Sequence, residues 1–97
     1  MRLNQVVLHS PGPAWKGGVG FREQPGVVDH VQHYAKLHEQ GKLLYGGPFI
    51  DADSGGMMIA ADGVTREELE DYAASDPAVI SGLLTFEVKT WYVVMAK

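Results

Sequence analysis

The sequence contains no cysteine among its 97 residues. Disulfide bonds, zinc–thiolate sites and cysteine nucleophiles are therefore excluded for this chain. Basic residues are also few, since 8 Lys and Arg stand against 12 Asp and Glu, for a formal net charge of −4. Nucleic-acid-binding proteins need a basic patch or stripe, and binding to an anionic membrane needs a similar cluster. We therefore expect neither a nucleic acid nor a membrane among the partners.

Long apolar runs are missing as well. No stretch approaches the roughly 20 apolar residues that a membrane-spanning helix requires, and the first residues do not lead into an apolar signal region. By default, this predicts a cytoplasmic protein. A length of 97 residues suits one domain over residues 1–97. Because so short a chain buries a small share of its surface, pairing with a second copy would add buried area.

Apolar stretches alternate with turns in a pattern that predicts four strands and two helices. The expected strands are 3–9, 42–46, 56–61 and 83–95, and the expected helices are 26–40 and 65–75. Thr65 and Glu68 form a capping box that starts the second helix, and Gly41 is placed to end the first. The order β-α-β-β-α-β is typical of the ferredoxin-like α+β fold, whose helices cover one face of the sheet.

The last expected strand carries large apolar residues on the face that the helices would leave uncovered. Alternation along the strand places Trp91, Val93 and Met95 on that face. An apolar face of this kind needs a cover, and closed two-fold dimers are the commonest oligomers. We therefore expect a homodimer that packs sheet to sheet.

The segment between the first strand and the first helix is a long loop rich in glycine and proline. Loops of roughly 15 residues are usually functional or disordered. This one contains Trp15, Phe21 and Arg22, and disordered segments seldom hold two aromatic residues. We expect it to fold over something, either a pocket or the edge of a subunit.

Several short motifs, taken together, resemble the YCII-related (YciI-like) family of the dimeric α/β-barrel superfamily. From about residue 3 to the C-terminus they are His30, Gly41-Lys42-Leu43-Leu44, Gly47-Pro48-Phe49, Gly55-Gly56, Asp76-Pro77 and Gly82. The resemblance implies a dimer of ferredoxin-like subunits and an active site that pairs the helix histidine with the aspartate of the Asp-Pro motif, here His30 and Asp76. One activity in the family is cofactor-independent dehydrochlorination of a chlorinated hydroxyquinol. The superfamily also includes muconolactone isomerases and cofactor-free monooxygenases.

His30 is the strongest candidate for catalysis. The helical pattern places it at the edge of the apolar face, and imidazole exchanges a proton near neutral pH. Asp76 could hold the ring in one tautomer, as the third member of a catalytic triad does. The alternative is a surface histidine beside an aspartate that only caps the turn before Pro77.

Five further residues are expected to contact a substrate. Tyr34 lies one turn after His30, although packing in the core would explain it equally well. Phe49 follows a Gly-Pro turn and would form a wall, or belong to a plain connection. The others are His9 at the end of the first strand, and Trp15 and Arg22 in the long loop. Family members often carry a basic residue shortly before the helix histidine, and Arg22 is the nearest one here.

The other histidines of the first helix are expected to be structural. His38 falls in the middle of the apolar face, which predicts a core position, whereas His33 falls on the solvent side. The spacing of these residues and His30 does not give an i, i+4 pair, so no helix metal site is predicted.

These features favour an enzyme of lyase or isomerase type that uses no cofactor and no metal. His30 would act as general acid or base, oriented by Asp76, on a small oxygenated compound that is aromatic or cyclic. The alternative is a non-catalytic homodimer that binds a small ligand or a protein partner. Only the enzyme requires His30 and Asp76 to lie within about 3 Å, or one bridging water.

Overall fold

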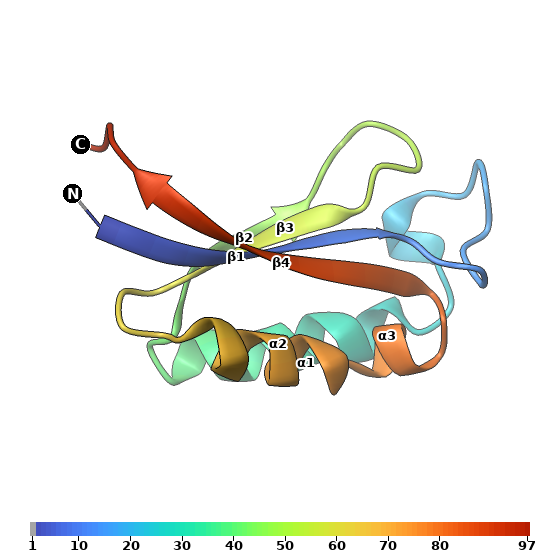
Figure 1. The fold of residues 1–97 in the computed structure, drawn as a ribbon. Coiled ribbons are helices and arrows are strands. Elements are labelled where there is room, and N and C mark those ends of the chain that lie inside the picture. Colours follow the sequence, from blue (N-terminus) through green and yellow to red (C-terminus); the bar gives the residue numbers. More distant parts are fainter. Residues whose placement is uncertain (1) are drawn as a thin grey trace.

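A computed structural model describes residues 2–97 as a four-stranded antiparallel sheet with helices on one face (Figure 1). In chain order the elements are β1 (Arg2–Pro11), the 3-10 helix η1 (Phe21–Glu23), α1 (Val27–Glu39), β2 (Leu43–Pro48), β3 (Gly56–Ala60), α2 (Arg66–Ala74), α3 (Pro77–Ile80) and β4 (Leu84–Val93). The strand order is β2-β3-β1-β4. This arrangement confirms the expected ferredoxin-like α+β fold. Within residues 2–97, no helix has both the length and the apolar character needed to cross a bilayer.

The helix boundaries follow from local signals in the sequence. The side chain of Thr65 accepts a hydrogen bond from the backbone N–H of Glu68 at 3.1 Å, which caps α2 as expected. Gly41 follows α1 with φ of +76°, a left-handed conformation that favours glycine. Asp76 caps the short α3, because its Oδ1 accepts from the N–H of Ala78 at 2.9 Å.

The buried face of α1 differs from the expected one. It consists of Val27, His30, Tyr34 and Leu37. His38 is exposed, so its expected place in the core is wrong, and Val31 is 53% exposed. Only part of the apolar face of α1 is therefore buried. The remaining part, with Val31 and His38, lines the cavity described below.

His33 does not lie free in solvent, as the sequence pattern suggests. Its ring stacks on Tyr72 of α2 with centroids 4.0 Å apart, and its Nε2 donates to the carbonyl oxygen of Tyr72 at 2.7 Å. The expected solvent position is therefore wrong, and His33 joins α1 to α2.

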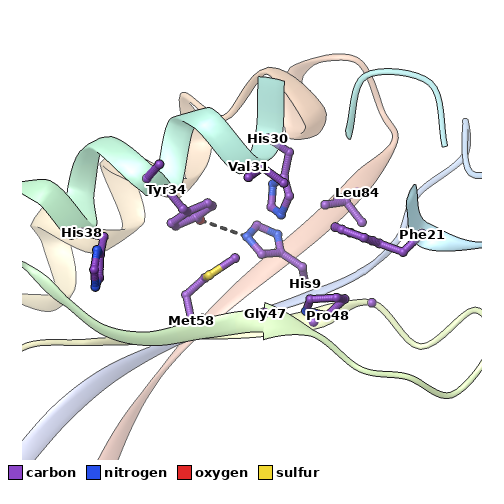
Figure 2. Close-up of a pocket in the computed structure, with 14 residues that line it drawn as sticks. His9, Phe21, His30, Val31, Tyr34, His38, Gly47, Pro48, Met58 and Leu84 are labelled. Atoms are coloured by element: carbon purple, nitrogen blue, oxygen red, sulfur yellow. Dashed lines mark hydrogen bonds between the residues drawn. The ribbon is translucent and has the colours of Figure 1, made fainter. Parts of the chain in front are cut away.

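One buried side chain makes three hydrogen bonds within the long loop over residues 12–24. Gln24 is only 2% exposed. Its Nε2 donates to the carbonyl oxygens of Lys16 and Val19, both at 2.8 Å, and its Oε1 accepts from the N–H of Lys16 at 2.9 Å. The loop is therefore closed on itself, and η1 within it directs Phe21 toward the cavity (Figure 2).

The sheet face opposite the helices carries apolar side chains. Strand register pairs Asn4 with Trp91 and Val6 with Ile59, so these four residues share this face. Trp91 is 46% exposed. A shallow depression on the same face is lined by residues that include Val6, Leu8, Met57, Ile59 and Trp91.

Candidate active site

A cavity of about 300 Å³ lies between α1 and the β2–β3 side of the sheet (Figure 2). All four strands, α1 and the long loop contribute to its wall. Its lining includes His9, Phe21, His30, Val31, Tyr34, His38, Pro48, Met58 and Leu84. The rest of the lining consists of Ala35, Gly46, Gly47, Gly55 and Gly56, so the space is bounded mainly by apolar side chains and backbone.

Gly55 and Gly56 allow the strands to meet at this wall. A Cβ on Gly55 would lie 1.9 Å from the carbonyl oxygen of His9, and the φ of Gly55 is +73°. A Cβ on Gly56 would lie 2.6 Å from the carbonyl oxygen of Gly47. A side chain at either position would push β3 away from its neighbours and deform the cavity.

His30 and Asp76 form a buried pair beside the cavity. Nδ1 of His30 lies 2.6 Å from Oδ2 of Asp76, and the two side chains are 4% and 0% exposed. An ionised carboxylate only accepts hydrogen bonds, so Nδ1 carries a proton, and in the neutral imidazole Nε2 then has the free lone pair. Asp76 therefore orients His30 with one oxygen and caps α3 with the other. The two roles that the sequence offers as alternatives for Asp76, the partner of His30 and the cap before Pro77, are therefore both present.

Nε2 of His30 remains open to a ligand. It has no hydrogen-bond partner among residues 2–97. It is also not fully enclosed, because the one fully enclosed side-chain polar atom without a partner in this range is Oδ1 of Asn4. Nε2 therefore keeps access to the cavity. The rings of Phe21, His9 and Tyr34 meet the imidazole edge to face, with centroids 6.1, 5.1 and 5.4 Å from it. These contacts fix the orientation of the ring.

His9 lies deeper than the rim position expected for it. It is 2% exposed, with Nε2 2.9 Å from the hydroxyl of Tyr34 and Nδ1 3.2 Å from the carbonyl oxygen of Thr85. Burial, and after it the charge of His30, lowers the pKa of His9 to about 4. Burial also raises the pKa of Tyr34. Both groups are therefore neutral at pH 7.

Three expected contact residues lie outside this cavity. Trp15, Arg22 and Phe49 line a neighbouring cleft between the long loop and the turn after β2. The indole N–H of Trp15 donates to Oδ1 of Asp53 at 2.8 Å, which holds the ring on that side. Phe21 and Pro48 lie between the two spaces, because they line both this cleft and the His30 cavity.

The cluster of His9, His30 and Asp76 also has the residue types of a metal site. One ligand atom from each lies within 4.8 Å of the others. Both nitrogens of His9, Nδ1 of His30 and both oxygens of Asp76 already take part in hydrogen bonds. A cation would have to break several of these bonds. The arrangement therefore fits proton transfer better than metal ligation.

Fold and site together define a ferredoxin-like α+β protein with a buried His–Asp pair beside a small cavity. No family model matches the sequence. The uncharacterised protein YjpA of Bacillus subtilis (strain 168) is 34% identical over 68 residues, which are 70% of this chain and 78% of YjpA. The chain therefore belongs to the same family as YjpA.

A solved structure with a similar fold is 5-chloro-2-hydroxyhydroquinone dehydrochlorinase (TftG) from Burkholderia phenoliruptrix AC1100, in complex with 2,5-dihydroxybenzoquinone. The match has a TM-score of 0.62 and covers 92% of this chain and 93% of TftG, with 17% sequence identity. Similarity at this level of identity concerns the fold, and it supports the resemblance to YciI-like proteins at that level.

Proposed function

We propose that this protein is a cofactor-independent enzyme of lyase or isomerase type in the YCII-related family. In this proposal, His30 acts as general acid or base on a small oxygenated ring compound, and Asp76 positions it. The observation that carries the proposal is the 2.6 Å contact between Nδ1 of His30 and Oδ2 of Asp76, buried behind a cavity that Nε2 can reach. This meets the distance that acid–base catalysis requires.

The geometry suggests how a proton would move. Nε2 of His30 takes a proton from a C–H or O–H group of the bound compound, and the carboxylate of Asp76 stabilises the imidazolium that forms. An isomerase returns that proton to another atom, whereas in a lyase a leaving group departs as a new double bond forms. A well-positioned acid–base group contributes roughly 10²- to 10⁴-fold to the rate.

The size and lining of the cavity support a small ring as substrate. A volume of about 300 Å³ is at the lower end of ligand pockets. The apolar wall provides contact area, while few polar groups converge in it. TftG was solved with 2,5-dihydroxybenzoquinone, a ring of suitable size. We extend this ligand class to the present chain as part of the proposal.

We also propose that the protein works as a homodimer joined through the uncovered sheet face. The apolar depression around Trp91 and Ile59 supports this arrangement. Two such faces packed together would remove that surface from water, at roughly 25 cal/mol for each Å² of apolar area.

A turnover screen tests the proposed activity. Chlorinated hydroquinones and enol lactones are incubated with the wild type, and products are followed by mass spectrometry and chloride release. We expect His30→Gln to lower kcat/KM at least about 100-fold. Lys36→Ala, an exposed position on the same helix, should retain the rate.

Equal rates for the wild type and His30→Gln would contradict the catalytic proposal. Circular dichroism of each variant ensures that a lost rate is not a lost fold. Binding without turnover across the whole screen would instead favour the alternative function, a non-catalytic module for small ligands.

A further inference from the structure

The hydrogen bonds of His9 determine its tautomer. Nδ1 lies 3.2 Å from the backbone carbonyl oxygen of Thr85. A carbonyl oxygen can only accept, so the proton of the neutral ring must be on Nδ1. Nε2 of His9 then has a lone pair and can only accept.

The tautomer of His9 in turn determines the direction of the Tyr34 hydroxyl. Nε2 of His9 lies 2.9 Å from that hydroxyl, and Figure 2 shows the bond between the two rings. Because Nε2 accepts, Tyr34 must donate its single proton to it. The phenolic oxygen then has only lone pairs to offer to a third group.

We propose that His9 is a positioning residue that makes the hydroxyl oxygen of Tyr34 a hydrogen-bond acceptor for the ligand. Nε2 of His30, a buried residue on the same cavity wall, is the second acceptor. The site therefore selects a neutral molecule that brings two hydroxyl donors. This inference rests on the proposed function and specifies its substrate class.

The two acceptors disfavour other classes of small molecule. A methyl ether lacks the second donor and would leave a buried acceptor unpaired, which is costly in an enclosed site. A carboxylate would place its charge against two lone pairs. His38 also lines the cavity, but it is exposed and can exchange hydrogen bonds with water, so it does not determine this preference.

The selectivity also fits the proposed chemistry. The first hydroxyl gives its proton to Nε2 of His30, and the resulting imidazolium N–H donates back to the oxyanion. The second hydroxyl keeps its proton and holds the ring through Tyr34. His9 itself takes no proton in this sequence, so its role is to orient Tyr34.

The tautomer can be tested without a ligand. Long-range ¹H–¹⁵N correlation spectra of histidine-labelled protein at pH 7 should show His9 with its proton on Nδ1. In Tyr34→Phe the tautomer should persist, while the Nε2 resonance shifts because it loses its donor. A His9 ring protonated on Nε2, or an unchanged Nε2 resonance in Tyr34→Phe, would overturn the inference.

Ligand selectivity is measured with matched probes. Catechol, resorcinol and hydroquinone are each titrated beside their monomethyl ethers by calorimetry. The wild type should bind at least one diphenol roughly tenfold more tightly than its ether. Tyr34→Phe and His9→Leu should lose that preference, and His9→Gln should restore part of it, because its amide oxygen can accept from Tyr34.

Two outcomes distinguish this inference from the proposed function. Ethers that bind as tightly as all three diphenols would overturn the selectivity. Clear selectivity with the expected His9 tautomer, but no turnover in the screen, would refute the proposed enzyme and leave the role of His9 intact.

Discussion

At the residue scale, the site depends on side chains that each make two contacts. Asp76 holds His30 with one oxygen and α3 with the other. His9 connects Thr85 to Tyr34 through its two nitrogens. In each pair, one hydrogen bond determines whether the next atom donates or accepts. Conservative substitutions should therefore alter proton positions more than they alter the fold.

Asp76→Asn should separate these two roles. An asparagine still caps a helix well, so α3 should persist. Its NH₂ group would donate to Nδ1 of His30 and shift the imidazole proton to Nε2, where it blocks proton abstraction. We expect a loss of about 1–3 kcal/mol in the free energy of unfolding. Activity should fall at least about 100-fold. Urea denaturation and steady-state kinetics measure the two effects, and wild-type kinetics in this variant would contradict the assigned role.

His9 should make stability depend on pH. Its pKa is about 4 in the folded protein and 6.5 ordinarily, so between these values the unfolded chain binds a proton that the folded chain does not. Stability is therefore complete above pH 6.5 and decreases as the pH falls toward 4. The loss reaches up to about 3 kcal/mol. Urea denaturation of the wild type and His9→Gln measures it, and an equally steep fall in both proteins would contradict this origin.

At the element scale, these helix boundaries can be predicted because each has a local cause. Thr65, Gly41 and Pro77 act on their immediate neighbours, and the structure follows them. The buried face of α1 is different, because His30 is buried by Asp76, which lies 46 residues further along the chain. A helical wheel carries no information about such a partner, which explains why it favours His38 instead.

The position of His9 depends on the length of β1. The strand continues to Pro11, past the expected end at residue 9. Val7 is buried in the core between sheet and helices, and alternation places His9 on that same side. The parity with Val7 is the sequence signal that could have identified His9 as part of the site. The pairing of His30 with Asp76 came from the family resemblance and not from helical periodicity.

The loop over residues 12–24 should depend on Gln24. Gln24→Ala would remove the partners of the Lys16 N–H and the Val19 C=O, and one of the two donors to the Lys16 C=O. We expect faster hydrogen exchange across this loop, with little change in β1 or α2, because the lost bonds are local. Exchange followed by mass spectrometry measures this. As a control, Gln40→Ala removes an exposed glutamine at the end of α1 and should not change exchange in the loop.

At the scale of the whole molecule, element order and the apolar residues of β4 both indicate a sheet with helices on one face and an apolar surface on the other. The helices cover one face of the sheet (Figure 1). The strand register places Trp91 on the other face. Both features can be predicted from the sequence, because strand alternation and element order require no knowledge of long-range contacts. That a second copy of the chain covers the other face is part of the proposed homodimer.

Trp91→Glu should therefore yield a monomer. A charge in the middle of an apolar interface is costly to bury without a partner. Light scattering at micromolar concentration should give a dimer for the wild type and a monomer for this variant. Val28→Glu, which changes an exposed apolar residue of α1, should remain dimeric. A monomeric wild type would contradict the sheet-to-sheet dimer.

We propose that Nε2 of His30 takes a proton from a hydroxylated ring in the cavity. 4-Nitrocatechol tests this directly, because its absorption moves to longer wavelength when it loses a proton. At a pH where the free probe is mainly neutral, the wild type should bind it with the spectrum of the anion. His30→Gln should bind it with the neutral spectrum. A neutral bound spectrum in the wild type, or the same anionic spectrum in His30→Gln, would contradict the claim.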